Sequence, residues 1–160
     1  MPDDNFHAID TWLQGLLTQL SPPRRRVMNG LIARELRRRN QKRITQQQNP
    51  DGSPFVARKR LRDKQGRIRR GMFARIKTAK NMKVAATADE AVVFFAGRQG
   101  YIARTHQYGL EDSVSRSGPR VKYPARRLLG FDGAGTKAIE QQILDFLGAY
   151  SDPNRSSIPM

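Results

Sequence analysis

The residues with the widest chemical range lie between positions 103 and 131, in the stretch ARTHQYGLEDSVSRSGPRVKYPARRLLGF. It contains His106, which is one of 2 histidines in the chain, together with tyrosines, arginines and acids. A histidine beside a hydroxyl and a carboxylate could serve as a general base, and arginines could hold an anionic substrate. Tyrosine and arginine are also the residue types that anchor protein interfaces. The stretch is therefore a candidate for either an active site or a contact surface.

The sequence contains no complete set of catalytic, metal-binding or phosphate-binding residues. There is no G-x-S-x-G elbow and no cysteine, and the two histidines, His7 and His106, lie far apart. The glycines of GFDGAG (130–135) have the spacing G-x-x-G-x-G, which is not that of a phosphate-binding loop. The acids are too scattered for a metal-dependent nuclease. We expect no enzyme, no catalytic residue, no metal, no cofactor and no small-molecule substrate, and we interpret His106 as a structural hydrogen-bonding residue.

Positive charge is concentrated in one block. The chain has 30 Lys and Arg against 14 Asp and Glu, and residues 24–83 hold 21 of these basic residues but only 3 of the acids. Such a block is either a solvated face or a surface for nucleic acid, an anionic membrane or an acidic protein. Only Phe55 and Phe73 are aromatic within it, so it has no stacking platform for bases. The candidate contacts to phosphate or to an acidic partner are Arg24, Arg25, Arg37, Arg38, Arg39, Lys42, Arg43, Arg67, Arg69 and Arg70.

Length and composition predict one soluble domain. The chain has 160 residues, of which 38% are hydrophobic, so we expect a modest core over residues 1–150 and a disordered tail over 151–160. No apolar run is long enough to span a bilayer, and the N-terminus is acidic rather than signal-like. An intracellular protein without membrane contact is the default expectation.

Two helices are predicted at the N-terminus, forming a hairpin over residues 4–44. Apolar residues at helical spacing mark the first helix, over 4–20, and Ser21-Pro22 is typical of the start of the second. The apolar face of the first helix consists of Phe6, Ile9, Leu13, Leu16, Leu17 and Leu20. That of the second consists of Val27, Met28, Leu31, Ile32 and Leu36.

A mobile basic loop is predicted over 45–71, with a turn at Asn49–Gly52 and with Phe55 either in the core or anchoring a partner. Three short antiparallel strands are expected over 72–78, 82–87 and 90–97, within a strand region 72–97. Residues 100–109 could form a helical turn or a strand, and 110–124 look irregular. We therefore predict an interface loop over 98–131, with its far end held in the core by Leu128, Leu129 and Phe131.

A final helix is predicted over 136–150, capped by Thr136 and burying Ile139, Ile143, Phe146, Leu147 and Tyr150 on one face. The order of elements indicates an α+β fold, in which the N-terminal helical hairpin and C-terminal helix pack on a small antiparallel sheet. Long basic and Pro/Gly-rich loops complete this predicted architecture.

Several motifs resemble one known family. The order NPDGSPF, RRGMFARIKTAKNMKVAAT and FAGRQGYIARTHQYGLEDSVSRSGPRVKYPARRLLGF is similar to the phage virion morphogenesis proteins, the tail completion proteins of contractile-tailed phages such as P2 and Mu. The resemblance covers about residues 5–148, and its most specific parts are IARTHQYG and YPARRLLGF.

The resemblance implies a structural role late in tail assembly. It implies a protein in the host cytoplasm during assembly, and then in the virion tail or neck, which completes the head-proximal tail end so that head and tail can join. It also implies contacts with tail-tube and neck or connector proteins, and self-association into a ring, with a hexamer favoured by family analogy. The predicted interface residues are Phe55, Tyr101, His106, Tyr108, Tyr123, Arg126 and Arg127. A basic, non-enzymatic nucleic-acid-binding protein is the alternative, and non-specific DNA contact in a ring channel is compatible with both readings.

Overall fold

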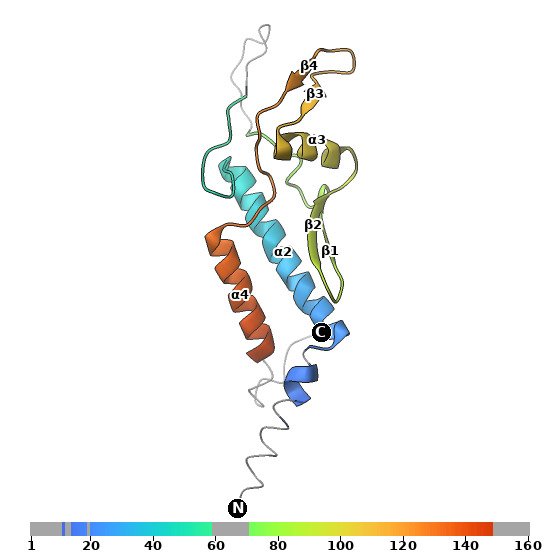
Figure 1. The fold of residues 1–160 in the computed structure, drawn as a ribbon, viewed down its shortest axis with the longest axis vertical. Coiled ribbons are helices and arrows are strands. Elements are labelled where there is room, and N and C mark those ends of the chain that lie inside the picture. The colour runs from blue at the N-terminus through green and yellow to red at the C-terminus, as the bar shows by residue number, and fades with distance from the viewer. Residues whose placement is uncertain (1–10, 12–13, 19, 59–70, 149–160) are drawn as a thin grey trace, which may run out of the picture.

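A computed structural model describes residues 11, 14–18, 20–58 and 71–148. The described chain is elongated, with a long central helix that has a second helix on one side and a β-hairpin on the other (Figure 1). The predicted α+β class is confirmed. The elements are α2 (Pro22–Gln46), β1 (Met82–Ala86), β2 (Ala91–Phe95), α3 (Gly97–Tyr108), β3 (Glu111–Ser113), β4 (Arg120–Lys122) and α4 (Gly133–Gly148).

Helix α2, with 25 residues, lies at the centre of the fold. It begins where expected, with Ser21 at the N-cap and prolines in the first turn, and it ends at Gln47, which adopts the left-handed conformation with φ 59°. Its buried residues include Ile32 and Leu36, as predicted, but Val27 is 51% exposed and does not belong to the apolar face. Of the predicted helix 4–20, residues 11 and 14–18 are helical, and most of the remainder lies outside the described residues.

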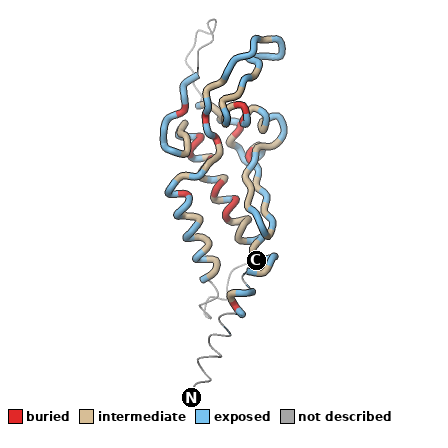
Figure 2. Tube along the Cα trace, viewed as in Figure 1, coloured by how far each residue is buried: buried red, intermediate tan, exposed pale blue. Residues whose placement is uncertain are grey.

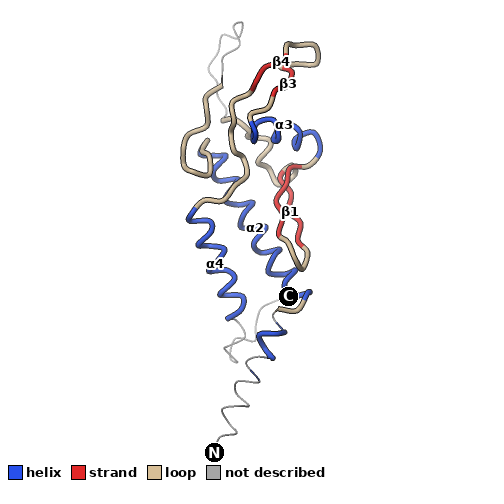
Figure 3. The backbone as a smooth tube through the Cα atoms, in the orientation of Figure 1, coloured by secondary structure: helices blue, strands red, loops and turns tan. Residues whose placement is uncertain are grey.

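The sheet between 72 and 97 has two strands instead of three. β1 and β2 pair antiparallel, with Met82 opposite Phe95 and Ala86 opposite Ala91. Residues 72–78 fold into consecutive turns, so the strand predicted there is wrong (Figure 3). Phe73 takes a positive φ of 64°, and its carbonyl accepts a hydrogen bond from the Lys77 N–H, a pairing that an extended strand cannot make.

The predicted interface loop is largely regular structure. Residues 97–108 form α3, and a short hairpin of β3 and β4 occupies most of the region expected to be irregular (Figure 3). Gly109 ends α3 with φ 64°, a left-handed conformation that favours glycine. A Cβ at Gly109 would also lie 3.0 Å from the Ala125 nitrogen, so glycine is required there both for the turn and for close packing.

The loop predicted over 45–71 is structured in its first part. The Gln47 carbonyl accepts from the Phe55 N–H at 2.7 Å, and the Asn49 N–H donates to the Ser53 carbonyl at 2.8 Å, which closes the expected turn. Residues 47–55 are therefore held by hydrogen bonds to α2 and among themselves, and Val56 and Ala57 by bonds from Arg126. Residues 59–70 lie outside the described part of the chain.

The core lies near the C-terminal end of α2 (Figure 2). Leu128 is fully buried and Leu129 packs against the core, as predicted, whereas Phe131 is 67% exposed and does not hold the chain there. The chain beyond Leu129 turns outward to begin α4, which explains the difference. The buried core residues are Ile44, Phe55, Ile76, Met82, Ala103 and Leu128.

Helix α4 starts three residues earlier than predicted and is capped by Asp132. The Gly135 N–H donates to Asp132 Oδ1 at 2.6 Å, so Asp132, and not Thr136, is the capping residue. Ile139, Ile143, Phe146 and Leu147 form its half-buried face, and Tyr150 lies outside the described residues. This face packs on α2, and α2 in turn packs on the β1–β2 hairpin (Figure 1).

Candidate protein-interaction site

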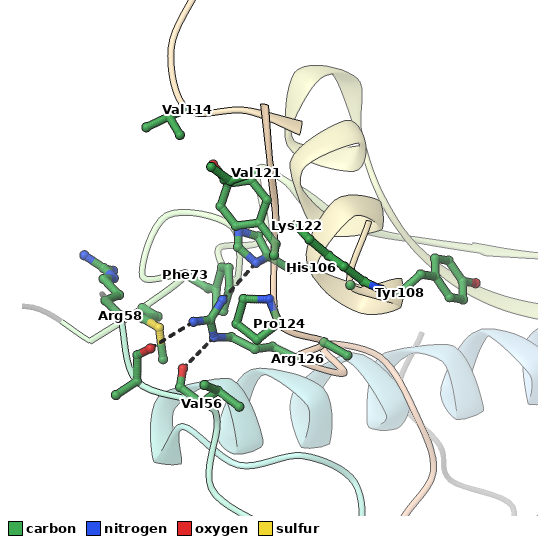
Figure 4. A pocket seen from close by; sticks show the side chains of 15 residues that line it. Val56, Arg58, Phe73, His106, Tyr108, Val114, Val121, Lys122, Pro124 and Arg126 are labelled. Carbon is green, nitrogen blue, oxygen red and sulfur yellow. Dashed lines mark hydrogen bonds between the residues drawn. The ribbon is translucent and has the colours of Figure 1, made fainter. Parts of the chain in front are cut away.

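A cavity of about 940 Å³ opens beside α3 and the β3–β4 hairpin (Figure 4). Its walls come from the chain after the 49–54 turn, from the 72–73 turn, from the end of α3 and from the segment that leads out of β4. Most of the lining is apolar or aromatic. The lining residues are Val56, Ala57, Arg58, Met72, Phe73, His106, Tyr108, Gly109, Val114, Val121, Lys122, Tyr123, Pro124, Ala125 and Arg126.

Arg126 is a buried, charged residue in the lining of this cavity. Its side chain donates to the carbonyl of Val56 at 2.7 Å and to that of Ala57 at 3.2 Å, and it lies 3.1 Å from His106 Nδ1 (Figure 4). A guanidinium can only donate, so Nδ1 accepts and the neutral ring carries its proton on Nε2. Arg126 is only 4% exposed, and its hydrogen bonds all stay within the chain. Only a small part of its side chain reaches the cavity, and its interface role stays a prediction.

His106 is uncharged at neutral pH. Burial is the largest cause that lowers its pKa, and the positive charges of Arg126 and Arg58 add to it, so that the pKa falls to about 4 against an opposing effect of Asp112. A protonated ring would also turn Nδ1 into a second donor facing the guanidinium. The geometry gives His106 a structural role, in line with the interpretation made from the sequence.

A row of aromatic rings packs against the His106 imidazole. Phe73 meets His106 edge-on at 4.8 Å between ring centroids, and His106 meets Tyr123 at 5.0 Å. Phe55 extends this row, since its ring centroid lies 5.8 Å from that of Phe73, and the residue is 6% exposed. Of the two alternatives for Phe55, the structure shows the core one, and Phe55 is not a surface anchor.

Side-chain amides fix the extended segment 125–130. The Arg127 N–H donates to Asn49 Oδ1 at 2.9 Å, and Gln107 bonds both the N–H and the carbonyl of Leu129, at 3.0 and 2.9 Å. Asn40 Oδ1 accepts from the Gly130 N–H at 3.1 Å. The motif YPARRLLGF is thus held by three other parts of the chain. A side chain at Gly130 would collide with Pro50, because its Cβ would lie 2.4 Å from Pro50 Cγ.

The other predicted interface residues divide into two groups. Tyr108 and Tyr123 line the cavity together with His106 and Arg126, so the structure brings these four together. Tyr101 and Arg127 are exposed but do not line it. Tyr101 and Tyr108 are 60% and 68% exposed, so their rings remain available to a partner.

Several of the predicted basic contacts are paired inside the protein. Arg25 lies 3.4 Å from Asp89, Arg38 and Arg39 both bind Glu35, and Arg43 lies 3.1 Å from Asp132. The hydrogen bond from Arg38 is the largest cause that lowers the pKa of Glu35. Arg25, Arg39 and Arg43 connect α2 to other parts of the fold, whereas Arg38 binds within α2. Arg43 is buried, so it is not a surface contact.

The remaining predicted basic contacts differ in position. Arg24 lies over the Phe146 ring at 5.1 Å, and Arg37 is half-buried. Lys42 is exposed, and with Arg34 and Arg38 it forms an exposed row on α2 that we call the basic ridge. Arg67, Arg69 and Arg70 lie outside the described residues.

A sequence profile of the phage virion morphogenesis family matches residues 4–148. The chain belongs to this family. It is also 37% identical over 147 residues to the tail completion protein S of Escherichia phage P2, an alignment that covers 90% of this chain and 98% of that protein. No solved structure matches the chain.

Membership of the virion morphogenesis family confirms the resemblance found in IARTHQYG and YPARRLLGF. These two motifs lie side by side, because the Arg126 N–H donates to the His106 carbonyl at 2.7 Å and the Tyr123 N–H donates to the Leu110 carbonyl at 3.1 Å. They build one wall of the cavity between them. In the part of the chain that the structure describes, no group of three metal-ligating side chains occurs, and no helix is long and apolar enough to cross a membrane.

Sequence reasoning missed the amides and the cap that organise this region. The region is held together by Asn40, Asn49, Gln107 and Asp132. The three amides are common polar residues with no recognisable spacing. Only Asp132 carried a usable signal, because an acid three residues before Gly135 at a helix start is typical of an N-cap.

Proposed function

We propose that this chain is a structural phage protein that completes the head-proximal end of the tail and so enables the joining of head and tail. The observation that carries this proposal is the 37% identity to the P2 tail completion protein S across 98% of that protein. An alignment of nearly complete length supports the same role better than a shared fold alone would. The proposed sites of action are the host cytoplasm during assembly and then the virion tail or neck.

The protein would act as a ring on the tail tube, with neck or connector proteins as its other neighbours. A ring needs a head-to-tail interface between two different patches of each subunit. An elongated subunit with a projecting β3–β4 hairpin at one end supports such an arrangement (Figure 1). A hexamer is favoured by family analogy, and non-specific contact with DNA in the channel is part of the same proposal.

The projecting hairpin is the part of the interface that can be changed without touching the core. Ser113 pairs with Arg120, so a two-residue Asn-Gly turn can replace residues 114–119 and close the hairpin directly. We expect this variant to fold, because Val114 and the residues between it and β4 are absent from the buried core. It should nevertheless fail to support tail completion.

The experiment uses the phage that encodes this chain. The gene for the chain is deleted from the phage, and the protein is supplied from a plasmid. Without the protein, electron micrographs should show filled heads and separate tails, and the wild-type chain should restore joined particles. Purified protein mixed with isolated tail tubes should bind one end of the tube in negative stain. Normal particles without the protein, together with the absence of any ring and of any tube-end binding, would refute the proposal.

A further inference from the structure

The cavity beside α3 has the chemistry of a docking groove. Its rim exposes apolar surface, since Val56 is 53% and Val114 42% exposed, next to the exposed Tyr108 ring. Arg58 and Lys122 are exposed on the same rim, and Arg126 lies beneath. Among the described residues that line the cavity, none is an aspartate or glutamate. An apolar groove with a cationic rim fits an amphipathic partner that carries acids.

The N-terminal residues of this chain have the complementary composition. Residues 1–20 contain Asp3, Asp4 and Asp10 but no lysine or arginine, whereas 21 of the 30 Lys and Arg of the chain lie in the block 24–83. Their apolar residues recur at helical spacing, which is the pattern of a helix that lies in a groove. In the described part of this stretch, Leu17 is 60% and Leu20 44% exposed, so this end of the apolar face is not covered by its own subunit.

The groove and this segment lie at opposite ends of α2. Gln47, at the C-terminal end of α2, donates from Nε2 to the carbonyl of the cavity residue Met72 at 3.0 Å. Residues 14–18 lie at the N-terminal end of α2 (Figure 1). The 25 residues of α2 span about 37 Å. The ten residues before Thr11 reach about 35 Å when fully extended and about 15 Å as a helix, so a helical segment cannot return to the cavity of its own subunit.

We propose that the cavity of one subunit receives the acidic, amphipathic N-terminal segment, residues 3–20, of a second copy of this chain. The contact joins the cavity, at the C-terminal end of α2 in one subunit, to the segment at the N-terminal end of α2 in the next. It is therefore heterologous, which is the type of contact that closes a ring. Apolar side chains of the segment lie along the groove, and its carboxylates face Arg58 and Lys122. This inference rests on the proposed assembly into a ring and names the two surfaces that form it.

A charge swap between the two surfaces tests the contact. One variant carries Arg58→Glu and Lys122→Glu on the rim, and the other carries Asp3→Lys and Asp10→Lys on the segment. Sedimentation velocity of the wild type should show association that increases with concentration. Each double variant should weaken the association at least about tenfold in Kd, and the combined four-site variant should recover most of the loss. The double variant Lys83→Glu, Lys137→Glu, which makes the same change in net charge as the rim variant but at exposed positions away from the groove, should associate like the wild type or more tightly.

A labelled peptide of residues 1–20 provides the second measurement, by fluorescence anisotropy with the full chain. It should bind the wild type and the Lys83→Glu, Lys137→Glu control, and it should bind the rim variant at least about tenfold more weakly. The inference is overturned if the peptide does not bind, or if it binds the rim variant and the wild type equally. It is also overturned if the rim variant still forms rings and attaches to tail tubes, in which case the proposed function stands without it. Failure of the wild type to attach to tubes would instead contradict the proposed function.

Discussion

The Arg126 guanidinium connects two separate parts of the chain through backbone carbonyls. Its donors satisfy Val56 and Ala57 on one side and His106 on the other, and the side chain is almost fully buried. Burial lowers the pKa of Arg126, followed by the charge of Arg58, but an arginine still remains charged under any practical condition. The cost of this buried charge is offset only as long as all its acceptors stay in place.

The variant Arg126→Met should therefore destabilise the protein by about 2–4 kcal/mol, because it removes the bonds of a buried guanidinium to the Val56 and Ala57 carbonyls and to His106. Urea unfolding followed by circular dichroism measures this loss. The neighbouring variant Arg127→Met is the matched control, since the Arg127 side chain is exposed, and it should change the free energy of unfolding by less than about 0.5 kcal/mol. Equal effects of the two variants would contradict the role given to Arg126.

Stability should also fall in mild acid because of His106. Its pKa is about 4 in the folded chain and 6.5 in the absence of these neighbours, so the unfolded chain binds the proton first as the pH falls. The His106 contribution is complete above about pH 6.5 and is lost as the pH falls from 6.5 towards 4. Because the ring is only half-buried, we expect a loss of about 1–2 kcal/mol over this range.

Urea midpoints of the wild type and of His106→Gln at pH 7.5 and pH 4.5 measure this effect. The wild type should lose more stability between the two pH values than His106→Gln does. His7→Gln is the matched control, because it removes the other histidine and leaves His106 in place. If the wild type and His106→Gln lose the same amount, the neutral state of His106 does not contribute to stability.

Residue types alone grouped side chains that do meet in the structure, but they did not indicate which of them are buried. His106, Tyr108, Tyr123 and Arg126 do meet around one cavity, as their clustering in the sequence suggested. The assignment of individual side chains to the surface was less successful, since Arg126 is buried. Whether an arginine faces solvent depends on carbonyls brought close by long-range folding, which local sequence does not reveal.

At the scale of elements, helices were easier to predict than the short strands. The start of α2 follows from the Ser-Pro pair, and the half-buried face of α4 follows from 3.6-residue periodicity. The segment 72–78 has the composition of a strand, yet it forms turns because Phe73 and Ile76 both point into the core around the end of α2. Tertiary packing outweighs β propensity in so short a segment.

Asp132 joins two elements and should be the most sensitive position of the α4 junction. It caps α4 through the Gly135 N–H and pairs with Arg43 on α2. Burial opposes its ionisation most strongly, but the Gly135 hydrogen bond and the two arginines Arg43 and Arg39 together lower its pKa. Its contribution to stability is thus present above the ordinary pKa of an aspartate and is lost as the pH falls through the lowered value.

The variant Asp132→Ala should destabilise the protein by about 2–3 kcal/mol, because it removes the cap and leaves the largely buried Arg43 without its counterion. Asp132→Asn keeps a capping oxygen and should lose only about 1 kcal/mol. Guanidinium unfolding curves compare these variants with Asp145→Ala, an exposed acid near the other end of α4 that should stay within about 0.5 kcal/mol of the wild type. An Asp132→Ala variant as stable as Asp145→Ala would refute the junction.

At the scale of the whole molecule, the fold changes how the net charge of +16 is distributed. In the sequence, 21 of the 30 Lys and Arg lie in the block 24–83. In the structure, Arg25, Arg39 and Arg43 bind acids from other elements or from α2 itself, so their charge is partly neutralised. The basic ridge is exposed along α2, although its member Arg38 also binds Glu35.

The basic ridge should mediate weak contact with DNA and no more. In a salt series with a random duplex, binding should be weaker than micromolar at physiological salt and should tighten as salt is removed, because counterion release is its source. The variant Arg34→Glu, Lys42→Glu removes two cations of the ridge and should reduce the slope of log K against log salt by about two. Arg38 stays unchanged because it binds Glu35.

The matched control is again Lys83→Glu, Lys137→Glu, which lowers the net charge by the same amount elsewhere on the surface. A general attraction between a basic protein and DNA depends on net charge, so it would weaken equally in both double variants. Contact through the ridge predicts a larger loss for Arg34→Glu, Lys42→Glu, and it places α2 towards the channel of the proposed ring. Micromolar or tighter binding at physiological salt would favour the alternative, a nucleic-acid-binding protein, whereas equal losses would leave α2 with no special relation to DNA.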